Sequence, residues 1–194
     1  MRTVFFDVDT QIDFLYPAGS LYVPAGESIV ERVALLNTFA ASSGSAVISS
    51  MDAHTEDDPE FKVWPHHCIV ETIGQKKPAI TLLGKRVVVP SGPCEFALDG
   101  IEQVLLEKQT IDVFSNRNLR DILARFDAER YIVYGVLTEV CVRDAVFGLL
   151  STGQRVELVT DAVRALTDEA HDRALGEIVA AGGELTTVAR VMEE

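Results

Sequence analysis

The chain has 194 residues, of which 47% are hydrophobic and 24% charged, a composition typical of one globular domain with a single core. Its formal net charge of −13 argues against a nucleic-acid partner, because phosphate binding requires a surplus of Lys and Arg. Asp7, Asp9 and Asp13 interrupt the first apolar stretch, and no run approaches the roughly 18 apolar residues of a spanning helix, so we expect neither a signal peptide nor a membrane partner.

The chain begins with a predicted βαβ unit. Residues 3–9 (TVFFDVD) form a nearly continuous apolar run, which is typical of a strand buried on both faces. Apolar residues then recur at helical spacing between positions 29 and 40, and Gly44 ends this predicted helix. Residues 45–52 (SAVISSMD) predict a second buried strand.

The regular alternation stops between residues 53 and about 100. This segment contains five of the seven prolines and three of the four histidines. Long irregular insertions in compact domains are usually functional or disordered, so we interpret it as a metal-site and insert region. Residues 87–89 suit either a short strand or a hairpin arm, and the role of residues 75–100 stays open.

The alternation resumes after residue 100. The apolar periods predict further strands and helices in this order: strand 104–108, helix 119–126, strand 131–136, helix 138–153, strand 156–161, helix 170–179 and strand 184–189. The whole chain, 1–194, is therefore predicted to be one α/β domain with three α/β/α layers. Its mostly parallel sheet has about six strands, with the connectivity of a Rossmann-type fold.

Four chemically active side chains lie at predicted strand ends. Asp9, Asp52 and Lys108 each close a strand, and Cys141 follows residues 131–136. Because parallel sheets place their sites at the carboxyl ends of the strands, we expect these four to converge. Each has a plainer alternative: a carboxylate such as Asp9 can cap a turn, and most lysines are solvated.

Cys141 is the candidate nucleophile. Thr138 is a predicted N-cap, which places Cys141 in the first helical turn, where the helix dipole lowers a thiol pKa. The N–H groups of that turn can also receive an oxyanion. The alternative is a buried cysteine that packs as a small hydrophobe. Cys68 and Cys94 lie in the irregular segment and are interpreted as bystanders, all three being reduced thiols in a cytoplasmic protein.

A cluster of metal-ligating residue types occurs at the start of the irregular segment. It comprises Asp52 and His54 in D-A-H, then Glu60, then His66 or His67 in W-P-H-H-C. Carboxylates and imidazoles in this combination suit a divalent metal such as zinc. The alternative is that these are solvated loop residues.

Together these motifs carry a family resemblance. VDTQIDF at the first strand, DAH, WPHHC, a strand-end Lys108 and GVLTEVCVRD match in order and spacing along nearly the whole chain. The sequence resembles the nicotinamidase/pyrazinamidase branch of the isochorismatase-like cysteine hydrolases, and this resemblance implies the isochorismatase-like version of the predicted fold.

The resemblance also implies a reaction and a catalytic triad. Nicotinamide, and also pyrazinamide, would be hydrolysed to the acid and ammonia through a thioester on Cys141, with Asp9 taking the thiol proton and Lys108 stabilising the charged pair. Backbone N–H groups of Leu137 and Cys141 would form the oxyanion hole, beside a cis peptide bond between Val136 and Leu137.

In this family a metal ion holds the ring nitrogen of the substrate while two aromatic side chains, here Phe14 and Trp64, sandwich the ring. The implied metal ligands are Asp52, His54, Glu60 and His67. Glu60 stands where the family commonly has histidine, and His67 is preferred to His66 because W-P-x-H is the pattern it resembles. Zinc is the first choice of metal, with Fe²⁺ or Mn²⁺ as alternatives.

Two other functions stay open from the sequence. One is another small-amide or ureide hydrolase of the same superfamily. The other is a catalytically silent protein of this fold that binds metal or acts through thiol redox chemistry. We expect a small-molecule partner and allow for a homo-oligomer. The exact amide, the metal and the oligomeric state are not determined by the sequence.

Overall fold

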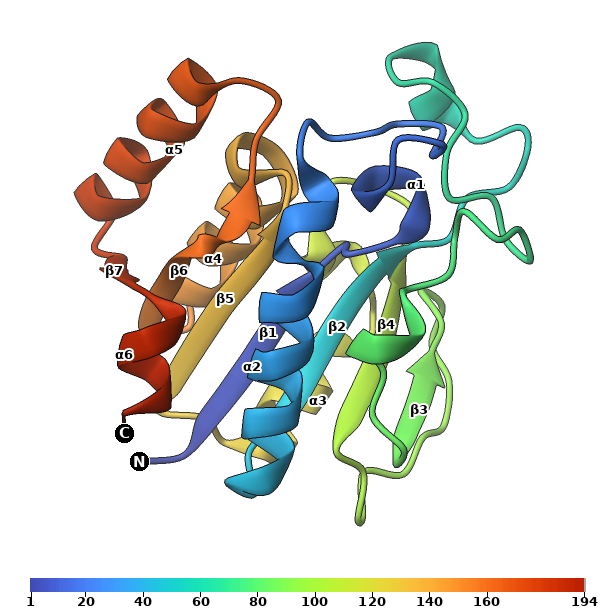
Figure 1. The fold of residues 1–194 in the computed structure, drawn as a ribbon. Coiled ribbons are helices and arrows are strands. Elements are labelled where there is room, and N and C mark those ends of the chain that lie inside the picture. Colours follow the sequence, from blue (N-terminus) through green and yellow to red (C-terminus); the bar gives the residue numbers. More distant parts are fainter. Residues whose placement is uncertain (194) are drawn as a thin grey trace.

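The computed structural model describes residues 1–193, which form a seven-stranded parallel sheet between helices (Figure 1). The strands are β1 (Thr3–Val8), β2 (Ala46–Asp52), β3 (Arg86–Val89), β4 (Gln103–Lys108), β5 (Arg130–Val136), β6 (Arg155–Arg164) and β7 (Glu184–Thr186). Their order across the sheet is β3-β4-β2-β1-β5-β6-β7. The three-layer α/β prediction is confirmed, with one strand more than the six expected, because residues 86–89 pair with β4 as an edge strand.

Helices cover both faces of the sheet. α2 and α6 lie on the face turned toward the viewer in Figure 1, and α3 and α4 lie behind the sheet. The helices are α1 (Ile12–Leu15), α2 (Val30–Ser42), α3 (Leu119–Phe126), α4 (Arg143–Leu150), α5 (Asp168–Ala180) and α6 (Val188–Met192). No helix within residues 1–193 is long and apolar enough to cross a membrane.

Two predicted boundaries are wrong for local reasons. The predicted strand 184–189 ends at Thr186, because the Thr187 hydroxyl accepts a hydrogen bond from the Arg190 N–H and so begins α6. The predicted helix 138–153 opens with a π-helical turn, Thr138–Val142, and its α-helical part ends at Leu150. π-Helical turns occur frequently at functional sites.

The centre of the sheet brings β5 very close to β1 at their carboxyl ends. Gly135 pairs with Val8 and has a φ of 125°. A Cβ at this position would lie 2.0 Å from the Val8 carbonyl oxygen. Only glycine permits both this backbone conformation and this approach, and the chain leaves β5 toward Cys141 immediately afterwards.

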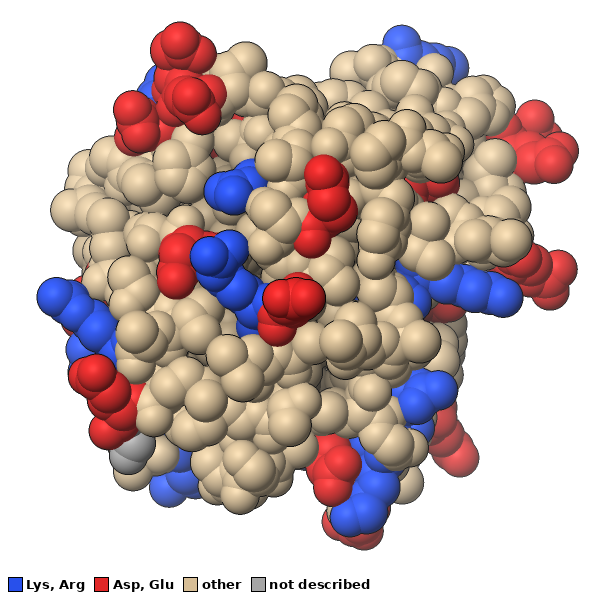
Figure 2. All heavy atoms as spheres, in the orientation of Figure 1, with Lys and Arg blue, Asp and Glu red and all other residues tan. Residues whose placement is uncertain are grey.

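The irregular insert is anchored to the body of the domain. Asn37 on α2 donates a hydrogen bond to the Thr81 carbonyl at 2.7 Å. The buried ammonium of Lys77 lies 3.2 Å from Asp7 on β1. On the face seen in Figure 2, acidic and basic side chains are interspersed among a large uncharged area, so this face carries no broad basic patch.

Candidate active site

Lys108 is the central charge at the carboxyl edge of the sheet. Its Nζ lies 2.9 Å from Asp9 Oδ2, 2.5 Å from Asp52 Oδ1 and 3.8 Å from Cys141 Sγ. Asp52 and Lys108 are register partners on β2 and β4, and Asp9 directly follows β1. The four residues predicted to converge are therefore placed together by neighbouring strand ends.

Asp9 is held in place by its backbone and by Ser50. The residue has a φ of 50°, a left-handed conformation that turns the chain sharply after β1. Its N–H donates to the Ser50 carbonyl at 3.1 Å, and the Ser50 hydroxyl donates to Asp9 Oδ1 at 2.7 Å. The second carboxylate oxygen faces Lys108, so both oxygens have a defined environment.

Burial and charge shift these groups in different directions. Burial raises the pKa of Asp9, and Lys108 only partly opposes this rise. Burial acts the same way on Asp52, but Lys108, His54 and His67 outweigh it and hold the pKa of Asp52 well below its usual range. Although burial opposes its charge, Asp52 and Asp9 keep the pKa of Lys108 well above its usual range. Asp9 is therefore the carboxylate better suited to accept a proton.

Cys141 differs from its predicted state. Burial raises the pKa of its thiol well above the usual range, Lys108 opposes the rise, and a hydrogen bond to Asp9 also favours the neutral thiol. Thr138 is not the N-cap: Leu137 takes that position, and the Thr138 hydroxyl lies 3.4 Å from His171 Nδ1 instead. The resting group is a neutral thiol next to a carboxylate that can receive its proton.

Asp52 also belongs to a second buried cluster, with His54 and His67, which lies at the carboxylate oxygen that does not face Lys108. Their ligand atoms all lie within 4.8 Å of one another. The Nε2 atoms of His54 and His67 are 3.8 Å and 3.6 Å from Asp52 Oδ2. These are separations that one shared ion would accommodate.

The remaining imidazole nitrogens orient both rings. His54 Nδ1 lies 3.0 Å from Asp58 Oδ2, and His67 Nδ1 lies 2.7 Å from the Pro65 carbonyl oxygen. A proton on each Nδ1 leaves a lone pair on each Nε2, which is the usual arrangement of histidines that bind metal. Both ring nitrogens of His54 are buried and neither makes a hydrogen bond of good geometry within residues 1–193, although Nδ1 has the short ion-pair contact to Asp58. The buried Nε2 without such a bond fits a metal ligand.

Without a metal, the cluster attracts a proton. Burial lowers the pKa of His54, but the carboxylates of Asp52 and Asp58 outweigh it and raise the pKa to about 8. A cation at this position is therefore electrostatically favoured, and a divalent ion would compete with that proton.

Glu60 and His66 occupy different positions. Glu60 is half-buried and lines the same pocket as Asp52 and His67, but it lies outside the close cluster of three. Burial, together with the charge of Asp52, raises the pKa of its carboxyl. His66 is exposed, and its ring stacks on Phe61 with centroids 4.2 Å apart. His67 is thus the member of the pair that faces Asp52.

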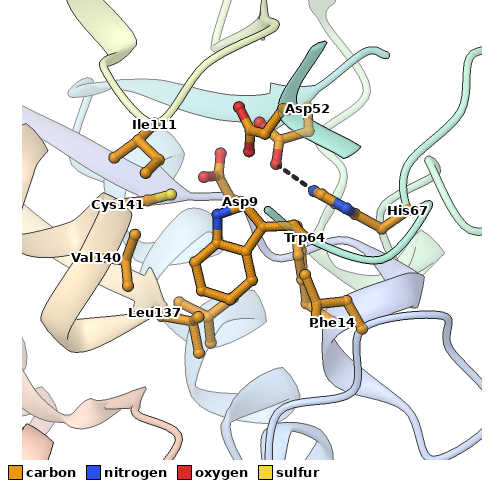
Figure 3. Close-up of a pocket in the computed structure, with 12 residues that line it drawn as sticks. Asp9, Phe14, Asp52, Trp64, His67, Ile111, Leu137, Val140 and Cys141 are labelled. Atoms are coloured by element: carbon orange, nitrogen blue, oxygen red, sulfur yellow. Dashed lines mark ion pairs between the residues drawn. The ribbon is translucent and has the colours of Figure 1, made fainter. Parts of the chain in front are cut away.

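A narrow pocket that opens to solvent connects the two groups (Figure 3). Its polar lining comprises Asp52, Glu60 and His67 together with Asp9 and Cys141. The other walls are apolar and comprise Phe14, Leu21, Trp64, Ile111, Val136, Leu137 and Val140. The Val136–Leu137 peptide bond is cis. The pocket suits a small, flat molecule with one polar end.

Comparison with known proteins gives a family for this arrangement. The family model described as the isochorismatase domain matches residues 3–190. The chain belongs to the isochorismatase family of hydrolases. The nicotinamidase of Escherichia coli K12 is 28% identical, over 94% of this chain and 93% of its own length. An Arabidopsis thaliana protein described as a probable inactive nicotinamidase is 24% identical, over 100% and 96%.

Solved structures give the same family. The crystal structure of a Pyrococcus horikoshii pyrazinamidase in complex with zinc superposes on this isochorismatase domain with a TM-score of 0.83. It is 26% identical, and the match covers 96% of this chain and 99% of that one.

Several site residues of this isochorismatase domain were missed from the sequence. Asp58 follows His54 by four residues, and this spacing in the same loop could have indicated a partner for the imidazole. Leu21 and Ile111 line the pocket from irregular segments with no periodic signal. Within residues 1–193 all three cysteines are free.

Proposed function

We propose that the protein is a metal-dependent cysteine amidohydrolase that converts nicotinamide to nicotinate and ammonia, and pyrazinamide to the corresponding acid. The observation that supports this most directly is the shared carboxylate of Asp52. It joins an Asp9–Lys108–Cys141 group to an Asp–His–His cluster, and both lie on one small pocket. The similarity to a bacterial nicotinamidase and to an archaeal pyrazinamidase supports an amide as the substrate.

In the proposed reaction, Asp9 accepts the thiol proton as Cys141 Sγ attacks the carboxamide carbon. The oxyanion that forms is received by backbone N–H groups of Leu137 and Cys141, both of which line the pocket. The C–N bond then breaks, and Asp9 returns the proton to the leaving nitrogen, which departs as ammonia. Water attacks the thioester and gives a proton to Asp9. The C–S bond then breaks, the acid is released, and Asp9 returns the proton to Cys141 Sγ.

Lys108 stabilises the thiolate in this scheme, and it remains charged while it does so. Its ammonium lies between Asp9 and Cys141, so it stabilises the thiolate as the proton leaves. It also stays charged throughout, because two buried carboxylates hold its pKa far above neutrality. The cost of burying this cation is offset by keeping both ion pairs intact.

The rest of the pocket would hold the ring. Phe14 and Trp64 both line the pocket, with the Trp64 indole in the middle of the view in Figure 3 and Phe14 to its lower right, and both offer aromatic faces to a flat heterocycle. A divalent ion bound by Asp52, His54 and His67, with Glu60 as the proposed fourth ligand, would supply a Lewis-acid position for the ring nitrogen. Two carboxylates and two imidazoles suit zinc first, with Fe²⁺ or Mn²⁺ as alternatives.

Activity on a substrate panel tests the proposal. Ammonia release would be measured for nicotinamide, pyrazinamide, benzamide and a small ureide, with purified protein reconstituted with Zn²⁺, Fe²⁺ or Mn²⁺. We expect turnover of the two heterocyclic amides and much slower turnover of benzamide, which has the same shape but no ring nitrogen. Turnover of the ureide alone would support the other hydrolase function, and no turnover at all would place this protein with its probable inactive plant relative.

A further inference from the structure

The side-chain amide of Gln11 lies where a neighbouring strand would otherwise pair with Asp52. β1 ends at Val8, which is the register partner of Ser50, so β2 extends two residues further than its neighbour. On the opposite side, Asp52 pairs with Lys108 of β4. The backbone N–H and C=O of Asp52 therefore point toward the edge of β2 on which β1 no longer pairs.

Gln11 replaces that missing strand. The Asp52 N–H donates to Gln11 Oε1 at 2.7 Å, and Gln11 Nε2 donates to the Asp52 carbonyl at 2.8 Å. The second Nε2 hydrogen is donated to the Gln75 carbonyl at 2.7 Å. This pattern fixes which end of the amide is oxygen, because a flipped amide would place donors against the Asp52 N–H.

The bonds are enclosed by protein. Gln11 is 0% exposed and Asp52 is 2% exposed, so water does not replace these hydrogen bonds if the amide is removed. The same amide also ties the insert to the site through Gln75. Gln11 therefore fixes the backbone at Asp52, whose carboxylate contacts both Lys108 and the two imidazoles.

We propose that Gln11 is a positioning residue that sets the orientation of the Asp52 carboxylate, and so couples the metal cluster to Lys108. The inference rests on the function proposed above, in which Asp52 serves both groups. Gln11 would then be an outer-shell partner, a residue that orients a metal ligand without touching the metal. Loss of such a partner typically weakens metal binding by about 10- to 100-fold.

The chain contains a matched control, Gln103. It is also a glutamine with 0% exposure and three hydrogen bonds: it accepts from the Leu83 N–H and donates to Ser49 and to the Thr81 carbonyl. It begins β4, roughly 16 Å along the strand from Lys108. Replacing either glutamine with methionine removes the same polar groups at nearly constant volume.

The test measures Co²⁺ affinity and the Co²⁺ absorption spectrum of the full-length protein after its metal is removed. We expect Gln11→Met to weaken Co²⁺ binding by about 10- to 100-fold and to change the spectrum, which reports ligand geometry. Gln103→Met should lower the thermal stability but keep the wild-type affinity and spectrum. Gln11→Glu keeps the side-chain volume and the acceptor for the Asp52 N–H, but it places an oxygen against the carbonyls of Asp52 and Gln75. We therefore expect it to weaken Co²⁺ binding too. This variant replaces Gln11→Met in the test if Gln11→Met does not fold.

Wild-type affinity and spectrum in the Gln11 variants would overturn the inference, as would equal changes in Gln103→Met. If the wild-type protein binds no Co²⁺, the metal site proposed above fails separately. The rate of Cys141 alkylation then tests the Lys108 side of the coupling: a change in the Gln11 variants but not in Gln103→Met supports the inference, and no change overturns it.

Discussion

Asp52 and Lys108 end neighbouring strands and form a buried ion pair, with Lys108 Nζ 2.5 Å from Asp52 Oδ1. The other carboxylate oxygen, Oδ2, faces the Nε2 atoms of His54 and His67. One side chain therefore contacts both the cation next to the nucleophile and the imidazoles of the metal cluster. Chemistry at either group depends on the same carboxylate.

Removal of the Cys141 thiol should abolish turnover. We expect Cys141→Ala to lower kcat by about 10³-fold or more, because no other group can form the thioester. Cys141→Ser should be similarly inactive, since a hydroxyl is far harder to ionise. Cys94→Ala serves as the control, because Cys94 is also a free, half-buried thiol but does not line the pocket. Ammonia release by the Cys141→Ala protein would contradict the assignment.

Loss of Lys108 should slow alkylation of Cys141. A cation 3.8 Å from the sulfur lowers the thiol pKa, so Lys108→Met should raise that pKa further and reduce the iodoacetamide rate at pH 8 by about tenfold or more. Lys77→Met is the matched control, because Lys77 is also buried and paired with an aspartate, but its ammonium contacts Asp7 and Thr10 and not Cys141. Equal alkylation rates in the two variants would exclude the proposed contact.

The acid limb of the pH profile should lie above the usual range of aspartate. Asp9 must be deprotonated to accept the thiol proton, and burial raises its pKa. Activity is therefore present above the raised pKa and is lost as the pH falls through it. The pKa observed in the profile is an apparent value that belongs to the coupled Asp9–Cys141 pair. Measuring kcat/KM against pH gives this value. Asp9→Asn should lower kcat much more than it changes KM, and a larger effect on KM would argue against a base.

Glu60 should contribute to metal affinity less than His54 does, but measurably. It lines the pocket beside Asp52 and His67 without belonging to the close cluster. We expect His54→Ala to lose the metal and Glu60→Ala to bind Zn²⁺ about tenfold more weakly or worse. Glu56→Ala is the control, an exposed acid in the same loop. Unchanged metal content and affinity in Glu60→Ala would remove it from the ligand set.

A methyl group at Gly135 should destabilise the fold at the site. The added Cβ would lie 2.0 Å from the Val8 carbonyl oxygen, and the residue has a φ of 125°. We expect Gly135→Ala to reduce the free energy of unfolding by about 2–5 kcal/mol. Gly176→Ala on α5 has open space around its Cβ and should stabilise by about 0.5–1 kcal/mol. Denaturant unfolding of both variants would measure the two changes, and a stable Gly135→Ala protein would refute the close approach.

The apolar periods of the sequence determined the parallel sheet and the elements that flank it. They also placed Asp9, Asp52 and Lys108 at strand ends, because the apolar pattern that marks a buried strand, and the residue at which it stops, can be read from a short stretch of the chain. These positions also predicted that Asp9, Asp52 and Lys108 converge with Cys141. The roles of Asp9, Lys108 and Cys141 as a triad came instead from the family resemblance.

Only the tertiary structure decided how these groups act on one another. The raised pKa of Cys141 results from burial and from Asp9, which outweigh the helix-end effect expected from local sequence. The position of the His67 ring beside Asp52, the pocket walls Leu21 and Ile111, and the contact of Gln11 with Asp52 all depend on the path of irregular segments. Such segments have no periodicity, so long-range hydrogen bonds and packing, rather than local preference, determine where their side chains lie.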